Sequence, residues 1–130
     1  MAHRQYQEEV VLSAEESTGA GTVINVRDYD TIMLSFASAS SGNLTAKIQG
    51  AITISAPNFD SAATATNHWS YVESVDINNG DILDGSTGFA VSGTDAAITY
   101  DVNTSGLSFL TVNVTARSAG SITVIAGLFE

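Results

Sequence analysis

The residues with the clearest potential for chemistry lie in the stretch VDINNGDILDG, residues 75–85, where three aspartates and two asparagines surround two glycines. A calcium loop of the EF-hand type needs oxygen ligands at its first, third and fifth positions, glycine at the sixth and glutamate at the twelfth. Asp76 and Asn78 fit the first and third positions, but Gly80 occupies the fifth and Asp81 the sixth. The stretch therefore fails the template at positions that hold the ion.

The same stretch contains two dipeptides that are typical of tight turns. Asn79 is followed by Gly80, and Asp84 is followed by Gly85. Glycine adopts positive φ without strain, and asparagine or aspartate before it favours a turn. We therefore predict a corner between strands and no metal ligand. The alternative is a weak, irregular cation site formed by Asp76, Asn78, Asp81 and Asp84.

Side chains suited to catalysis are few. The histidines are His3, near the N-terminus, and His68, beside the strand-like run WSYVESVD, and the chain has no cysteine. No serine stands in a G-x-S-x-G motif, and no glycine-rich phosphate loop precedes a helix. His68 next to Trp69 is more typical of a residue at the start of a strand than of a general base. The sequence predicts a protein that is not an enzyme, with no catalytic residue and no cofactor.

Glu73 is the one carboxylate with an unusual predicted position. It shares strand parity with residues that are expected to face inward, namely Trp69, Tyr71, Val75 and Ile77. An inward carboxylate is explained by a β-bulge, by a contact between subunits, by a catalytic acid, or by a basic partner such as Arg27 or Arg117.

Aromatic residues offer a second kind of site, because flat rings on a β-sheet can stack on sugars. The candidates are Phe59, Trp69, Tyr71 and Tyr100. Against stacking, Trp69 and Tyr71 alternate in phase with apolar residues further along the same segment, which favours a place in the core or an interface. A carbohydrate-binding module therefore stays an alternative.

The elements that must position these residues are strands, because apolar residues recur with a period of two. In NLTAKIQGAITIS, residues 43–55, one predicted face carries Leu44, Ala46, Ile48, Ile52 and Ile54. Similar runs follow at intervals of about ten residues and are separated by turn residues, which predicts an antiparallel sheet protein. We expect an all-β fold, an antiparallel β-sandwich of about eight strands that is jelly-roll-like. Residues 55–68 lack the alternation and are predicted to form a long loop.

Length and charge limit the partners. The 130 residues suit one domain, predicted at residues 8–130 after a flexible N-terminal arm at residues 1–7. Four basic residues stand against 14 acidic ones, for a formal net charge of −10, so a nucleic-acid partner is not expected. The first residues show no long apolar run, so we expect neither a signal peptide nor a membrane anchor, and synthesis in a cytoplasm.

A resemblance adds to these patterns. The run YDTIMLSFASASSGNLTAKIQGAI, with the later pieces HWSYVE, DGSTGFAVSGTD and LTVNVTARSAGSITV, resembles the small virion proteins that decorate or cement the heads of tailed bacteriophages. The resemblance covers the chain from about Val26 to Val124. It implies a small β-sandwich or jelly-roll unit, often trimeric, that binds the major capsid protein on the outer capsid surface. Such proteins carry no catalytic motif, so no residue takes a role from the family.

The polar strand faces agree with assembly. They are rich in small uncharged residues, which lose little on leaving water. We therefore expect a homo-oligomer, most simply a trimer, whose interface uses these faces. The expected function is capsid decoration, with a tail or baseplate protein, a carbohydrate-binding module and an enzyme subunit as alternatives. The predicted interface residues are Thr45, Gln49, Thr53, Thr99, Thr111, Asn113 and Thr123.

Overall fold

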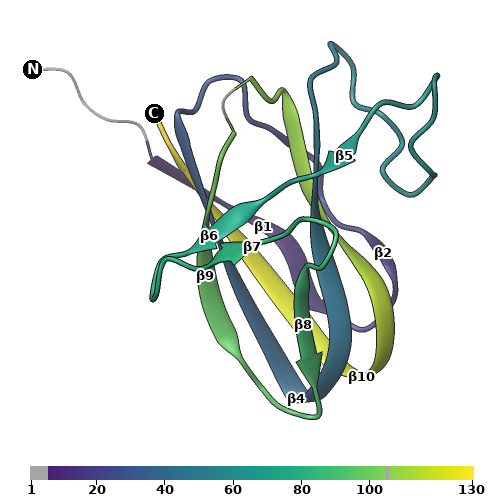
Figure 1. The fold of residues 1–130 in the computed structure, drawn as a ribbon, viewed down its shortest axis with the longest axis vertical. Coiled ribbons are helices and arrows are strands. Elements are labelled where there is room, and N and C mark those ends of the chain that lie inside the picture. Colours follow the sequence, from purple (N-terminus) through teal and green to yellow (C-terminus); the bar gives the residue numbers. More distant parts are fainter. Residues whose placement is uncertain (1–5, 105) are drawn as a thin grey trace, which may run out of the picture.

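The computed structural model describes residues 6–104 and 106–130, and this part of the chain consists of strands and loops without a helix. It therefore contains no helix long and apolar enough to cross a membrane. The strands, shown in Figure 1, are β1 (Tyr6–Glu15), β2 (Gly19–Ala20), β3 (Ile24–Asn25), β4 (Thr31–Ala51), β5 (Ser70–Tyr71), β6 (Ser74–Asp76), β7 (Ile82–Leu83), β8 (Phe89–Ser92), β9 (Ala97–Val102) and β10 (Phe109–Phe129).

Two long antiparallel strands, β4 and β10, form the framework. They pair along their whole lengths, from Phe109 opposite Ala51 to Phe129 opposite Thr31. Both turn back at the lower end of the molecule in Figure 1. At this bend the register shifts, as in β-bulges, and the backbone has positive φ at Ser40, Ser41 and Gly120. Small residues cluster there in both strands, which lets the two backbones bend together.

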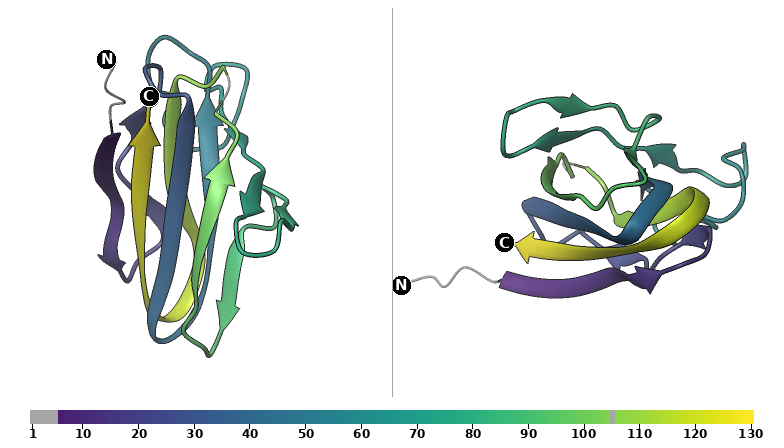
Figure 2. Two further views of the ribbon diagram at one scale, coloured as in Figure 1. Left: turned by 90° about the vertical axis from the view of Figure 1, so that its left-hand side faces the viewer. Right: turned by 90° about the horizontal axis from the view of Figure 1, so that it is seen from below.

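The bend divides the single hydrogen-bonded sheet into two layers (Figure 2). One layer has the strand order β1–β10–β4–β9–β6–β7 and uses residues 121–129 of β10 and 31–39 of β4. The other uses the remaining halves, residues 109–117 and 43–51, with β2 and β3 beside β10 and with β5 and β8 beside β4. We call these the six-strand layer and the short-strand layer.

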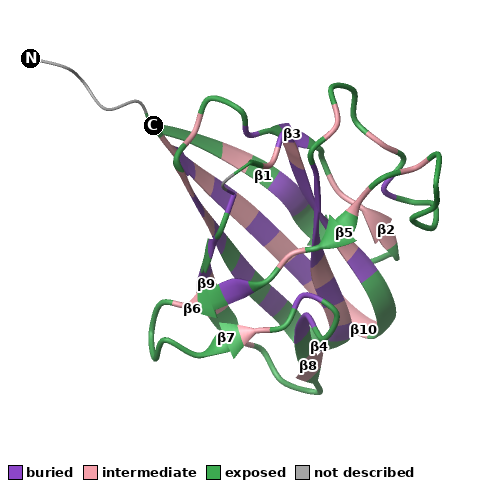
Figure 3. Ribbon diagram, turned by 45° about the horizontal axis from the view of Figure 1, so that its top comes forward, coloured by how far each residue is buried: buried purple, intermediate pink, exposed green. Residues whose placement is uncertain are grey.

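The core lies between the two layers. Alternate residues of β4 and β10 are buried, which gives the banded pattern along these strands in Figure 3. Phe36 of the six-strand layer contacts Phe89 of the short-strand layer, with ring centroids 5.2 Å apart. The fully buried side chains of β4 and β10 include Ile32, Leu34, Phe36, Leu110, Val112, Ile122 and Val124.

The predicted all-β antiparallel class is confirmed. The described residues form ten strands rather than about eight, and hydrogen bonds join them in one sheet; the jelly-roll arrangement stays a prediction. Residues 1–5 of the predicted arm lie outside the described residues. Tyr6 and Gln7, which were assigned to that arm, instead belong to β1, where they pair with Phe129 and Leu128.

The apolar strand face predicted for residues 43–55 is correct as far as Ile48 and wrong after it. Strand β4 ends at Ala51, and Ile52 and Ile54 lie in the loop after it, 75% and 90% exposed. The reason is that the alternation breaks at the end of the strand, where Gln49, Gly50 and Ala51 are all buried. A long loop begins here. As predicted, residues 55–68 contain no regular structure, apart from one bridge between Thr64 and Asn67.

Candidate functional site: an open sheet face

The aspartate-rich stretch forms a turn between β6 and β7. The backbone N–H of Asn78 donates to Asp76 Oδ1 at 2.9 Å, and the N–H of Asp81 donates to Asn79 Oδ1 at 2.9 Å. Gly80 has φ of +76° and donates to the Asp76 carbonyl at 2.8 Å. The prediction of a tight turn at Asn79 and Gly80 is therefore confirmed, with the asparagine and aspartate side chains used as turn acceptors.

The second predicted turn also begins at Asp84, whose carbonyl accepts hydrogen bonds from the N–H groups of Thr87 and Gly88, both at 3.1 Å. Asp84 Oδ1 accepts hydrogen bonds from the N–H and the hydroxyl of Ser86, at 2.8 and 2.7 Å. These bonds from Ser86 lower the pKa of Asp84 below its ordinary value. The residue with positive φ is Gly88 rather than Gly85, which is buried against the backbone of Val72. Among the described residues, no group of three or more histidine, aspartate or glutamate side chains could hold a metal ion.

We expect calcium and a chelator to leave the melting temperature of this protein unchanged. Asp76 and Asp84 are already acceptors for backbone N–H groups, and an ion that does not bind adds nothing to the stability of the folded state. Differential scanning calorimetry with calcium and then with a chelator checks this. A rise of several degrees with calcium that is lost in Asp81→Ala would instead establish the cation site.

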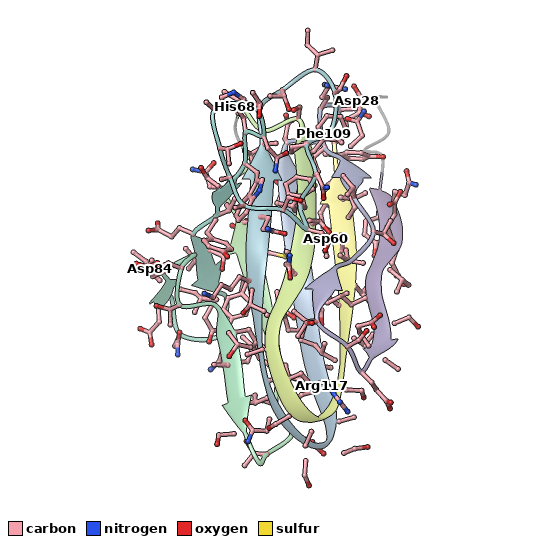
Figure 4. The ribbon with its side chains drawn as sticks, turned by 90° about the vertical axis from the view of Figure 1, so that its right-hand side faces the viewer. Asp28, Asp60, His68, Asp84, Phe109 and Arg117 are labelled. Carbon is pink, nitrogen blue, oxygen red and sulfur yellow. The ribbon has the colours of Figure 1, made fainter. Side chains whose placement is uncertain are left out.

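The candidate acid–base residues do not converge on one place in the described structure. His68 is exposed near the upper end of the molecule and Arg117 lies near the bend at the lower end (Figure 4). Glu73 is exposed rather than inward, so the prediction of a buried carboxylate is wrong. Arg27 donates to the Thr53 carbonyl, and Arg117 to the Gly120 carbonyl, so neither is the partner foreseen for Glu73. His3 lies outside the described residues.

The face that carries Glu73 is outward for a simple reason. On β6 the inward position is taken by Ser74, which pairs with Val102 of β9 and Leu83 of β7. Val72 lies two residues before Ser74, on the same side of the segment, and it also packs against the core. Tyr71, Val75 and Ile77 therefore point to the outside, where they are 38%, 37% and 54% exposed. The sequence predicted the alternation correctly but assigned the wrong side to the core.

The four aromatic candidates for sugar stacking are divided between three environments. Tyr100 lies in the core against Phe36, and burial, with a smaller effect from the Asp76 carboxylate, raises the pKa of Tyr100 above its ordinary value. Phe59 belongs to the long loop and is buried, with 3% of its surface exposed. Trp69 and Tyr71 touch, but their rings are inclined at 72°, with centroids 5.0 Å apart. They therefore do not form one flat platform.

The outer face of the short-strand layer is covered by loops of the same chain. The amide groups of Gln49 and Asn113 both donate to the Phe59 carbonyl of the long loop, at 3.0 and 3.2 Å. The Thr111 hydroxyl donates to the Thr22 carbonyl at 3.0 Å. Gln49 and Thr111 are fully buried within one chain. The expectation that they form a contact between subunits is therefore wrong, because the polar side chains bind this chain's own backbone.

The described residues leave the outer face of the six-strand layer uncovered, and we call it the open face. One row of neighbours crosses it from Val10 through Ile125 and Ser35 to Thr99. A second row crosses all six strands, through Glu8, Gly127, Met33, Asp101, Val75 and Ile82. Strands β1, β10, β4 and β9 run side by side in the left view of Figure 2.

The open face combines apolar side chains with few charges. Val10, Ile77 and Ile82 are 48%, 54% and 66% exposed, and the centre holds small or uncharged residues such as Ser35 and Thr99. Its charges are the carboxylates of Glu8, Glu73 and Asp101. The basic residues of the described chain, Arg27, Lys47 and Arg117, come from other parts of the fold. Exposed apolar side chains with few charges between them suit a contact with another molecule.

Comparisons with known proteins show the fold. No protein-family model matches the sequence, and a comparison with curated proteins finds no match. Among solved structures, the chain is similar to the SPBc2 prophage-derived protein YomS, with a TM-score of 0.74 at 10% identity over 100% of this chain and 97% of YomS. It is also similar to the PBSX exported protein XepA, with a TM-score of 0.74 at 9% identity over 100% of this chain and 39% of XepA. The chain thus shares its fold with a prophage-derived protein over nearly the whole of both chains, and with less than half of the PBSX exported protein.

Proposed function

We propose that this protein is a non-enzymatic structural protein of a tailed bacteriophage, and that it decorates the outer surface of the head. The observation that carries the proposal is the full-length likeness of its fold to a prophage-derived protein of nearly the same length. The resemblance of its sequence to head decoration proteins gives the more specific role. Its partners are then the major capsid protein and further copies of itself.

The open face supports the assembly part of this proposal. Its two rows of cross-strand neighbours carry mainly apolar and neutral side chains, which can be desolvated without the large cost of burying unpaired charge. Obligate interfaces bury on the order of 2,000 Å² or more, so a stable oligomer would have to cover much of the open face. We propose a homotrimer that meets through this face.

Electron microscopy of the native phage particle tests the proposed location. We expect density for this fold on the outside of the head, in contact with the major capsid protein. Density on the tail or baseplate would replace decoration with the alternative structural role. A particle that lacks the chain altogether would overturn the proposal.

Light scattering tests the interface separately. We expect the mass of an oligomer at micromolar concentration in both low and high salt, because apolar and neutral polar contacts are not screened as ion pairs are. Ser35→Glu places a charge at the centre of the open face, where Ser35 is exposed between Ile125 and Thr99, and should reduce the mass to that of a monomer.

Thr115→Glu is the matched control. Thr115 is also a small, exposed hydroxyl residue, but it lies in the short-strand layer, so the same substitution should leave the mass unchanged. A monomeric natural protein in both salt conditions, or an equal loss of mass in both variants, would refute the role of the open face.

A further inference from the structure

We propose that a hollow between the long loop and the short-strand layer binds a sugar unit of a glycan chain. The hollow has a volume of about 340 Å³, within the range of about 300–1,000 Å³ that is typical of small-molecule sites. Its lining combines two aromatic rings, two side-chain amides and one carboxylate. These groups belong to Trp69, Tyr71, Gln49, Asn113 and Asp60.

Gln49 reaches the hollow from the outer face of β4. Its neighbour Ile48 belongs to the core, so the alternation along the strand turns Gln49 to the opposite side, beneath the long loop. The backbone of Gln49 lies between Thr111 of β10 and Tyr71 of β5, with which it pairs. The side chain is therefore the part of Gln49 that faces the loop and the hollow.

The side-chain amide of Gln49 has an oxygen without a partner. Its Nε2 donates to the Phe59 carbonyl at 3.0 Å, and this hydrogen bond fixes the orientation of the amide. Gln49 is 1% exposed, and its Oε1 has no hydrogen-bond partner among the described residues, although buried polar atoms are nearly always paired. Because the amide lies on the loop side of the sheet, a donor in the hollow can reach this oxygen, directly or through a water.

Trp69 and Tyr71 form a corner in the wall of the hollow. Their ring centroids are 5.0 Å apart and their planes are inclined at 72°. The indole is held in place, because its N–H donates to the Ser61 carbonyl of the long loop at 2.9 Å. A pyranose has an apolar C–H face and an edge of hydroxyl groups. A corner of two rings can therefore contact a sugar on two sides, whereas a flat platform contacts one.

The polar groups of the lining suit a neutral ligand with several hydroxyl groups. Asp60, labelled in Figure 4, accepts a hydrogen bond from the Ala20 N–H at 2.7 Å through Oδ1, and its second oxygen can accept another. The Asn113 amide donates to the Phe59 carbonyl at 3.2 Å, and its oxygen can also accept. Among the described residues that line the hollow, Asp60 alone is charged. Sugar hydroxyl groups donate to such acceptors without a net charge of their own.

A second hollow extends the candidate site. It has a volume of about 580 Å³ and shares Ala63 and Trp69 with the first hollow. Asn67, His68 and Leu107 also line it. Because the two hollows meet at the indole, two linked sugar units can both contact Trp69. This arrangement favours a segment of a glycan chain over a single free sugar.

Fluorescence titration of the whole chain tests the site, because Trp69 is the only tryptophan of the sequence. The probes are the methyl glycosides of glucose, galactose and N-acetylglucosamine, together with cellobiose, lactose and chitobiose. We expect a saturable change in emission with at least one sugar, and binding about tenfold tighter for the disaccharide than for its single unit. N-methylacetamide is the control ligand, since it offers a peptide N–H donor without a sugar ring.

Tyr71→Ala removes one wall of the corner and should weaken binding of the sugar by about tenfold or more. Tyr6→Ala is the matched control, because Tyr6 is also an exposed tyrosine of a strand but lies on β1, outside the hollow. Gln49→Met removes the unpaired oxygen with little change in volume and should also weaken binding by about tenfold. Circular dichroism checks that each variant is folded, and Tyr71→Ala decides the test if Gln49→Met is not.

Three results would overturn the proposal. The first is unchanged Trp69 emission with every sugar at about 50 mM, where a site with a millimolar dissociation constant is almost full. The second is saturation of the same signal by N-methylacetamide, and the third is equal binding by Tyr71→Ala and Tyr6→Ala. Equal affinity for a disaccharide and its single unit would overturn the extension into the second hollow. None of these results depends on where the protein lies in a phage particle.

Discussion

Replacement of Phe36 by alanine is expected to lower the free energy of unfolding by about 3–5 kcal/mol, the range for a fully buried phenylalanine. Phe36 is inaccessible to solvent and lies between the two layers. Its ring contacts Phe89 at 5.2 Å and Tyr100 at 5.5 Å between centroids. The substitution leaves a cavity at the point where the halves of the sheet meet. This loss is a large fraction of the roughly 5–15 kcal/mol that stabilises a typical domain.

Denaturation in urea, followed by far-ultraviolet circular dichroism, measures the effect. Ile54→Ala serves as the control, because Ile54 is also apolar but is 90% exposed in the loop after β4, and its change should stay within about 0.5 kcal/mol. If Phe36→Ala and Ile54→Ala were destabilised equally, the core could not lie between the two layers as described.

Replacement of Gly120 by alanine is expected to lower the free energy of unfolding by about 2–5 kcal/mol, as the sum of two penalties. The first is conformational, because φ at Gly120 is +76°, a region that costs other residues about 1–2 kcal/mol. The second is steric, because a Cβ at this position would lie 2.6 Å from the Ala39 carbonyl oxygen, a cost of about 1–3 kcal/mol. The substitution therefore strains the bend that β4 and β10 share.

Gly93→Ala separates the two penalties in the same denaturation experiment. Gly93 has nearly the same φ, +71°, but no atom lies within 4 Å of the position its Cβ would take. It should therefore show the conformational penalty alone, about 1–2 kcal/mol. Equal losses in the two variants would mean that the strands do not approach each other at the bend as closely as Gly120 and Ala39 indicate.

The two outer faces of the sheet both carry uncharged polar side chains, but these side chains make different contacts on each face. On the short-strand layer they bind the backbone of the long loop, as Gln49 and Asn113 do at Phe59. On the six-strand layer Thr99 and Ser35 stay uncovered beside Ile125. Small polar side chains therefore do not by themselves mark an interface between subunits, because a loop of the same chain satisfies them equally well.

The class of fold and many core positions could be predicted from the sequence alone. Alternation with a period of two is a local property of each strand, so Ile32, Leu34 and Phe36 could be assigned to one face without knowledge of the neighbouring strands. The turn at Asn79 and Gly80 was equally local, because the asparagine–glycine pair favours positive φ wherever it occurs. These features depend on residues only a few positions apart.

The tertiary structure alone decided which side of a short strand faces the core. The sequence correctly places Val75 and Ser74 on opposite faces of the strand. Ser74 faces the core because β6 pairs with β9, which lies far along the chain. The same tertiary packing placed Gln49 beneath the long loop, beside the Phe59 carbonyl. It also determined that loops cover one layer and leave the other open. Register between distant strands depends on the packing of the whole sheet, and no short stretch of sequence contains that information.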